Sequence, residues 1–203
     1  MNLTELRSRV RLDLRDTDPT AQRWPDAALD RHIQRALREL SLAIPDEAAA
    51  QLTTTPGSRD LSLAGLDGLI GVDAVEYPVD RYPPAYVPFS RRGSTLTLLV
   101  ETAPQAAEPV RVLYARLHSL DAAGSTVPPQ LEELLAAGAA AYAALEQAAY
   151  AVNRVNAGGP DVWRQFQAWG NERLAAFTRG LARYGRRNAV RVRRLYLPAG
   201  PER

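Results

Sequence analysis

Three side chains of the types that hydrolases use as a catalytic triad lie close together at His118, Ser119 and Asp121. In a triad the nucleophile, the base and the orienting carboxylate must converge in space, which nearly adjacent residues do not readily achieve. The G-x-S-x-G turn that exposes a nucleophilic serine is also missing from the sequence. We therefore expect no catalysis here and interpret residues 118–129 as a linker.

Metal chemistry has two further candidate positions. Asp16 and Asp18 could belong to a metal-binding loop, but no glycine or distal glutamate follows at EF-hand spacing, so turn and capping roles are favoured. His32 is isolated and is expected to point outward from its helix. The sequence contains no cysteine and no phosphate-binding loop. We expect no enzyme activity, no cofactor and no metal.

Arginine supplies all 25 basic residues, and there is no lysine. A GC-rich genome explains this usage, although arginine also suits bidentate contacts with carboxylates and phosphates. The charge is uneven, because residues 154–194 contain ten arginines against Asp161 and Glu172, whereas residues 1–153 contain fourteen arginines against twenty acids. An acidic front and a basic back favour a directional partner or self-assembly.

The strongest structural signal is a long helix over residues 128–153. Pro128 and Pro129 open it, two glutamates occupy its first turn, and Ala dominates its middle. Its large apolar residues are Leu131, Leu134, Leu135, Tyr142, Leu145 and Val152. Such a helix is buried on more than one side, either at the centre of a bundle or also against a neighbouring subunit. Gly138, which is costly inside a helix, is expected to permit close approach by another backbone.

Three other helices are predicted around this one. Residues 2–15 have apolar side chains at helical spacing, and a second helix starts at Trp24-Pro25-Asp26 and ends at Pro45. Trp24 is expected to pack back on that second helix. A fourth helix runs from Pro160 to about residue 184, with a bulky stripe that complements the small residues of the third. The residues expected to form helix or subunit contacts are Trp24, Leu135, Gly138, Tyr142, Phe166 and Trp169.

Residues 51–118 lose the helical period and contain short β-rich runs separated by glycine and proline. Alternation is clearest where Val110, Val112 and Tyr114 share one face of a strand. We predict an α+β fold: a bundle of about four helices, an inserted antiparallel module of about five strands, and an extended C-terminal arm. The predicted divisions are residues 1–50 and 119–185 for the bundle, 51–118 for the β module and 186–203 for the arm.

The C-terminal arm combines arginines with an apolar tip, and Val190 and Val192 alternate with arginines as in an extended segment. It could be a solvated end, a nucleic-acid-binding arm or a protein-docking arm. The predicted docking residues are Arg186, Arg187, Arg191, Arg193, Arg194, Leu195, Tyr196 and Leu197. No signal peptide and no apolar run long enough to span a membrane is visible, so we expect a soluble intracellular product without membrane contact.

The order and spacing of these elements resemble the head–tail adaptor proteins of tailed bacteriophages, also called connector or neck proteins. The resemblance lies in Trp24-Pro25-Asp26 after a short helix, in VDAVEYP (72–78) and EPVRVLYA (108–115), and in residues 125–145, followed by another helix and a basic tail. It spans most of the chain.

This resemblance implies a virion structural protein at the head–tail interface, present in the host cytoplasm before assembly. It implies a ring, typically of twelve subunits, beneath the portal protein. The C-terminal segment would grip the portal, tail or neck components would bind the opposite face, and DNA would pass through the channel without sequence-specific binding. The alternative hypothesis is a nucleic-acid-binding helical protein that uses the arginine-rich arm.

Overall fold

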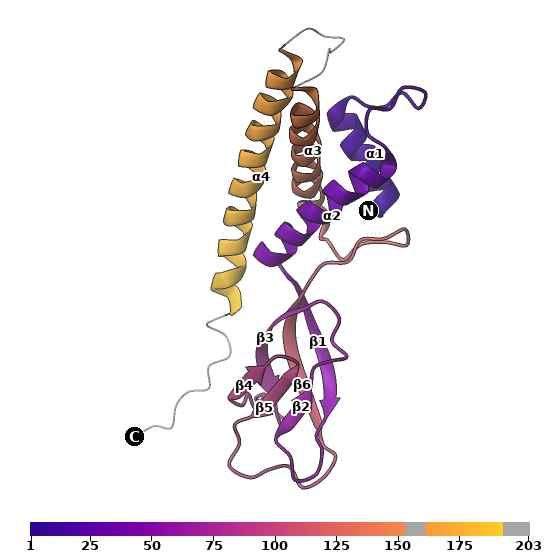
Figure 1. Cartoon of the computed structure of the whole chain (residues 1–203). Helices are drawn as coiled ribbons and strands as arrows, with labels where there is room; N and C mark the ends of the chain where they lie inside the picture. The colour runs from indigo at the N-terminus through magenta and orange to yellow at the C-terminus, as the bar shows by residue number, and fades with distance from the viewer. Residues whose placement is uncertain (153–160, 193–203) are drawn as a thin grey trace. The chain divides into compact units, whose positions relative to one another are not determined.

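The computed structural model describes residues 1–152 and 161–192, with side chains of the last helix as far as Arg186. The chain divides into two compact units (Figure 1). The helical unit contains Met1–Ile44 and His118–Arg186, and the β unit contains Pro45–Leu117. The predicted α+β class, with helices on both sides of an inserted β segment, is confirmed.

Four helices form the helical unit: α1 (Leu3–Leu14), α2 (Asp26–Ala43), α3 (Pro129–Ala151) and α4 (Val162–Val192). The helix α1 begins with a capping box, in which the side chain of Asn2 accepts a hydrogen bond from the backbone of Glu5 and the Glu5 carboxylate accepts one in return. In α3, Pro129 occupies the first turn, where its missing N–H costs nothing.

The helix α3 is the centre of the bundle, with α1 and α2 on one side and α4 on the other (Figure 1). The five alanines between positions 139 and 144 are all buried, although successive residues of a helix point to different sides of it. The central-helix interpretation is therefore confirmed, and one chain suffices to bury this helix. Val152, predicted on its apolar face, is instead half exposed just after the helix.

Large side chains meet glycines where α3 and α4 run side by side. A Cβ at Gly138 would lie 2.9 Å from the ring of Phe177, which is fully buried. A Cβ at Gly170 would lie 2.9 Å from the Leu145 side chain. The expectation that Gly138 admits another backbone is wrong, because an aromatic ring fills the space. The large-against-small complementarity of the two helices is confirmed.

The β unit contains two three-stranded antiparallel sheets. One has the order β1-β6-β3 and the other the order β2-β5-β4. The strands are β1 (Asp46–Thr53), β2 (Asp60–Ser62), β3 (Leu69–Glu76), β4 (Phe89–Arg92), β5 (Thr95–Leu98) and β6 (Pro109–Arg116). A core of side chains from both sheets includes Val110, Val112 and Tyr114, which confirms their predicted shared face.

Two boundaries differ from the sequence prediction. The strand β1 was missed because its alanines favour a helix, yet each of its residues pairs with β6, so the β unit begins at Pro45 rather than at residue 51. At the other end, α4 continues to Val192, so residues 186–192 are helical rather than extended. Residues 193–203 lie outside the described part of the chain.

Candidate assembly surfaces

The triad-like residues have structural roles in the helical unit. The Nε2 atom of His118 lies 3.0 Å from the carbonyl of Ile44, to which it donates, and Nδ1 lies 3.0 Å from the Thr126 hydroxyl. The backbone N–H of Ser119 donates to that same Thr126 hydroxyl. His118 thus joins the end of α2 to the linker, and its two ring nitrogens are already occupied.

The two aspartates after α1 organise a turn, as the sequence predicted. Asp16 is buried, forms a 2.6 Å ion pair with Arg11, and accepts a hydrogen bond from the backbone of Arg23. Asp18 accepts hydrogen bonds from the backbone and hydroxyl of Thr20, and these hydrogen bonds lower its pKa. Among the described residues, no cluster of three or more potential ligands could hold a metal ion.

His32 is the clearest error of the sequence analysis. It was expected to point outward, but it is 6% exposed, and Nε2 contacts the Glu146 carboxylate of α3. Burial lowers the pKa of His32 more than the adjacent carboxylate raises it. Glu146 also pairs with Arg31, and chiefly that hydrogen bond lowers the pKa of Glu146. The His32–Glu146 contact joins α2 to α3, and its two residues lie 114 positions apart in the sequence.

Trp24 and Phe166 pack together across the bundle. The indole Nε1 of Trp24 donates to the carbonyl of Ala143 over 3.2 Å, and its ring meets Phe166 edge-on, with 6.3 Å between centroids. The guanidinium of Arg23 lies 5.1 Å from the centre of the Phe166 ring. Trp24 therefore joins α3 and α4, which agrees with its predicted role in helix packing; the expected packing back on α2 did not anticipate these partners.

Tyr142 links α3 to the exposed side of α2. Its hydroxyl donates to Glu39 over 2.6 Å, and the guanidinium of Arg35 lies 3.9 Å from the ring centre. Burial and the Glu39 carboxylate raise the pKa of Tyr142 to about 12, so the phenol stays protonated at physiological pH. Leu135 is buried in the same core. These residues all pack within one chain, and any role in subunit contacts stays a prediction.

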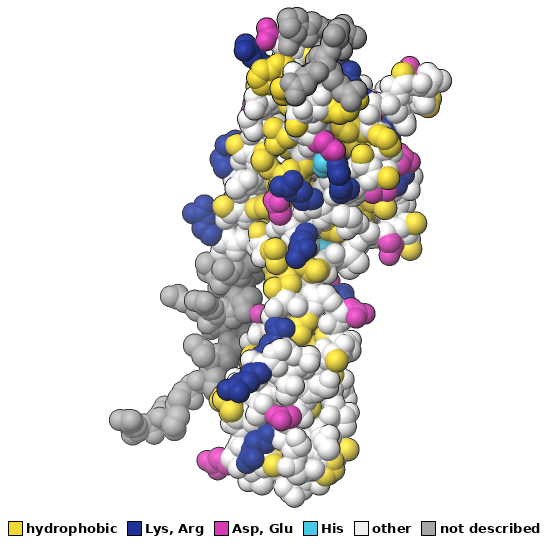
Figure 2. Space-filling model, viewed as in Figure 1, with side chains coloured by type: hydrophobic (Ala, Val, Ile, Leu, Met, Phe, Trp, Pro, Cys, Tyr) yellow, Lys and Arg dark blue, Asp and Glu magenta, His cyan; other side chains and the backbone are white. Residues whose placement is uncertain are grey.

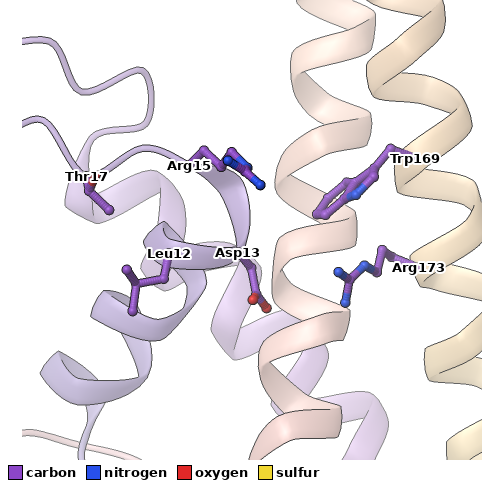
Figure 3. Close-up of a pocket in the computed structure, with 6 residues that line it drawn as sticks. All are labelled: Leu12, Asp13, Arg15, Thr17, Trp169 and Arg173. Carbon is purple, nitrogen blue, oxygen red and sulfur yellow. The ribbon is translucent and has the colours of Figure 1, made fainter.

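An open groove of about 530 Å³ lies between the end of α1 and the middle of α4. Its lining residues are Leu12, Asp13, Arg15, Thr17, Trp169 and Arg173. Figure 3 shows Asp13 and Arg15 on the α1 side, and Trp169 and Arg173 projecting from α4. We call this surface the α1–α4 groove. Trp169, predicted as a packing residue, therefore contributes both to the bundle and to this surface.

A set of exposed arginines lies along α4, and positive side chains over this helix are visible in Figure 2. These arginines are Arg164, Arg173, Arg179, Arg183 and Arg186. Within the described residues only Arg164 has a carboxylate partner, Asp161, at 3.3 Å. By contrast, Arg7 and Arg11 on α1 each pair with two carboxylates. Among the described residues, α4 therefore presents four arginines without an ion-pair partner, and it also presents the exposed Glu172.

The predicted docking residues are only partly described. Arg186 is exposed on α4, where Nε donates to the carbonyl of Ala182 over 3.1 Å. Arg187 and Arg191 lie in the final turns of α4. The remaining five lie outside the described residues: Arg193, Arg194, Leu195, Tyr196 and Leu197.

Comparisons with known proteins place the chain in a family. The family model described as SU10 adaptor protein matches residues 1–195. The chain belongs to the SU10 adaptor protein family. This membership confirms the resemblance to phage head–tail adaptors that the sequence suggested. No curated protein sequence matches the chain.

One similar solved structure is described as the neck of an empty GTA particle computed with C6 symmetry. The chain is 16% identical to the matching chain of that structure, with a TM-score of 0.32. The match covers 83% of this chain and 88% of that one.

In the described part of this chain, no helix is long and apolar enough to cross a membrane.

Proposed function

We propose that this member of the SU10 adaptor protein family is a structural adaptor at the head–tail interface of a tailed phage or phage-like particle. The observation that carries this proposal is the family match over residues 1–195, which includes both units and nearly the whole chain. In the finer form of the proposal, about twelve copies form a ring beneath the portal protein and extend the DNA channel. Tail or neck components bind the other face of the ring.

The described structure supports assembly through outer surfaces rather than through α3. The apolar α3 is already covered by α1, α2 and α4 of the same chain, so the monomer has its own core. Among the described residues, the surfaces open to partners include the exposed arginines of α4 and the charged α1–α4 groove. Positive charge on one surface favours anionic partners and directional association.

Assembly is tested with the full-length protein, alone and mixed with the portal protein of its own particle. We expect rings in negative-stain images, either in both samples or only when portal is present. Mass photometry of the same samples gives the number of copies. Strictly monomeric protein under both conditions would exclude the ring.

The portal-docking proposal concerns residues 186–203, of which Arg186, Arg187 and Arg191 lie on α4. The first test removes the residues after α4. Truncation after Val192 leaves the helix intact, so the melting temperature should change little, whereas portal binding should be lost. We expect Tyr196→Ala to weaken docking by roughly 2 kcal/mol if this tyrosine is an interface hot spot. Binding is measured by pull-down and interferometry with purified portal, with Tyr150→Ala, an exposed tyrosine of α3, as the control. Parental affinity of the truncated protein would exclude this docking site.

The nucleic-acid alternative has one supporting observation, the unneutralised arginines of α4. It predicts DNA affinity that falls steeply with salt and that falls again when Arg179 and Arg183 are changed to glutamine. If the protein is an adaptor that lets DNA slide, the parent and the variant with Arg179 and Arg183 changed should both bind DNA only weakly. The same portal-binding and DNA-binding measurements therefore separate the two functions.

A further inference from the structure

The β unit presents a tyrosine whose side chain is almost fully exposed to solvent. Tyr82 is 99% exposed and lies in a segment that we call the Tyr82 loop, residues 78–84. Pro83 and Pro84 follow it directly, and each proline restricts its own backbone and that of the residue before it. A tyrosine held in this way loses little conformational entropy when it binds, which is a property of interface hot spots.

The Tyr82 loop is fixed at its base by pairing and by charge. The backbone N–H of Tyr77 donates to the carbonyl of Ala85 over 2.9 Å, which closes the loop. Arg111 of β6 pairs with buried Glu76 at 2.7 Å and with Asp80 inside the loop at 2.9 Å. These contacts hold the start of the loop on the sheet and leave its tip, Arg81 and Tyr82, facing solvent.

The α1–α4 groove of the helical unit has the chemistry to receive this tip. It offers the side chain of Leu12, which is 66% exposed, and the partly exposed indole of Trp169 as contacts for an aromatic ring. The guanidinium of Arg173 lies over the Trp169 ring, 5.1 Å from its centroid. Asp13, Arg15 and Arg173 also line it, and none of them forms an ion pair within residues 1–152 and 161–186. Asp13 is thus a carboxylate without a basic partner there.

Arg81 is the matching cation, since it is exposed and forms no ion pair with any described residue. An arginine paired with a carboxylate, next to a tyrosine stacked on a tryptophan, is a combination of the residue types that dominate interface energetics. Both halves of the contact occur on every chain. A contact between two different surfaces of identical subunits is heterologous, and it can close into a ring.

We propose that the Tyr82 loop of one copy docks in the α1–α4 groove of a neighbouring copy, with Tyr82 against Trp169 and Leu12 and with Arg81 paired to Asp13. This inference rests on the proposed function, because it specifies a contact that would build the ring. The family match covers both the Tyr82 loop and the α1–α4 groove and gives no role to either; this inference gives each of them a role.

The test measures ring formation by the full-length protein, alone and on its own portal, by mass photometry. Tyr82→Ala should raise the concentration for half-assembly roughly 30-fold, the effect of losing one hot spot. Leu99→Ala is the matched control, because Leu99 is an exposed apolar residue of the same unit, and it should assemble as the parent does. An unchanged melting temperature establishes that both variants fold.

A charge exchange identifies the partner surface. Arg81→Asp and Asp13→Arg should each weaken assembly, and the double variant should restore it, because the pair is re-formed with opposite polarity. As a control, Arg92→Asp changes another exposed arginine of the β unit and should not be rescued by Asp13→Arg.

The possible results separate this inference from the proposed function. If the parent forms no ring alone or on portal, both are wrong. If the parent forms rings and Tyr82→Ala forms them equally well, or the exchange gives no rescue, only the loop–groove contact is wrong. If Tyr82→Ala prevents even single copies from binding portal, the loop contacts the portal and the proposed partner is wrong.

Discussion

Replacing Gly138 with alanine tests the packing of α3 against α4 most directly. Alanine is better than glycine inside a helix by about 1 kcal/mol. At this position, however, the new methyl group would lie 2.9 Å from three ring atoms of Phe177, which is fully buried, so the ring or the helix must shift to admit it. Overpacking of this kind costs about 1–3 kcal/mol. We therefore expect Gly138→Ala to destabilise the helical unit by about 1 kcal/mol.

Gly138→Leu keeps the helix propensity of alanine and adds three carbon atoms, so it should cost about 3 kcal/mol or more. Phe177→Leu in the Gly138→Ala background removes the ring that the methyl group meets. The effects of these two changes should therefore be non-additive, with the methyl group costing less in the Phe177→Leu protein. This coupling would assign the cost to one contact rather than to the helix as a whole.

The assay is chemical denaturation followed by tryptophan fluorescence. All three tryptophans, Trp24, Trp163 and Trp169, belong to the helical unit, so the signal reports its unfolding and not that of the β unit. Gly124→Ala is the control, because Gly124 belongs to the helical unit and a Cβ there meets nothing within 4 Å. If Gly138→Ala is as stable as the parent or more stable, the Phe177 contact does not limit this position.

Two further predictions concern charged groups. Arg11→Leu should destabilise the protein by about 3–5 kcal/mol, because it leaves Asp16 buried without its cation. The control is Arg9→Leu, on the exposed side of α1, which should change the stability little. Chemical denaturation measures the stability of both variants. His32 has a lowered pKa in the folded state, so the unfolded chain binds its proton more tightly. The stability that His32 contributes should be complete above about pH 6.5 and decline as the pH falls toward the lowered value. Denaturation at pH 7.5 and 5.5 should show this loss, and His32→Gln should reduce it; an equal loss in the variant would assign the slope to other groups.

Local patterns determined much of the helical unit. The prolines before Leu131 and the alanines that follow it predict α3 and its buried position, because helix propensity and an apolar surface all round the helix indicate the same result. The bulky stripe of α4 predicted its packing on small residues. The turn around Asp16 was also predictable, since aspartate commonly accepts nearby backbone hydrogen bonds.

Other features depended on partners that are distant in sequence. The alanines of β1 favour a helix by themselves and become a strand only because β6, more than fifty positions later, supplies the paired backbone. His32 is isolated in the sequence, and only the packing of α2 on α3 brings Glu146 to it.

The candidate site divides in the same way between sequence and structure. The prolines after Tyr82 are visible in the sequence and indicate a rigid loop, but they do not show whether the tyrosine is buried or exposed. The sequence by itself determined the family, the helices and the excess of arginine near the C-terminus. Only the tertiary structure decided which charges are neutralised and which surfaces remain for partners, because ion pairing and burial depend on side chains that folding brings together from distant segments.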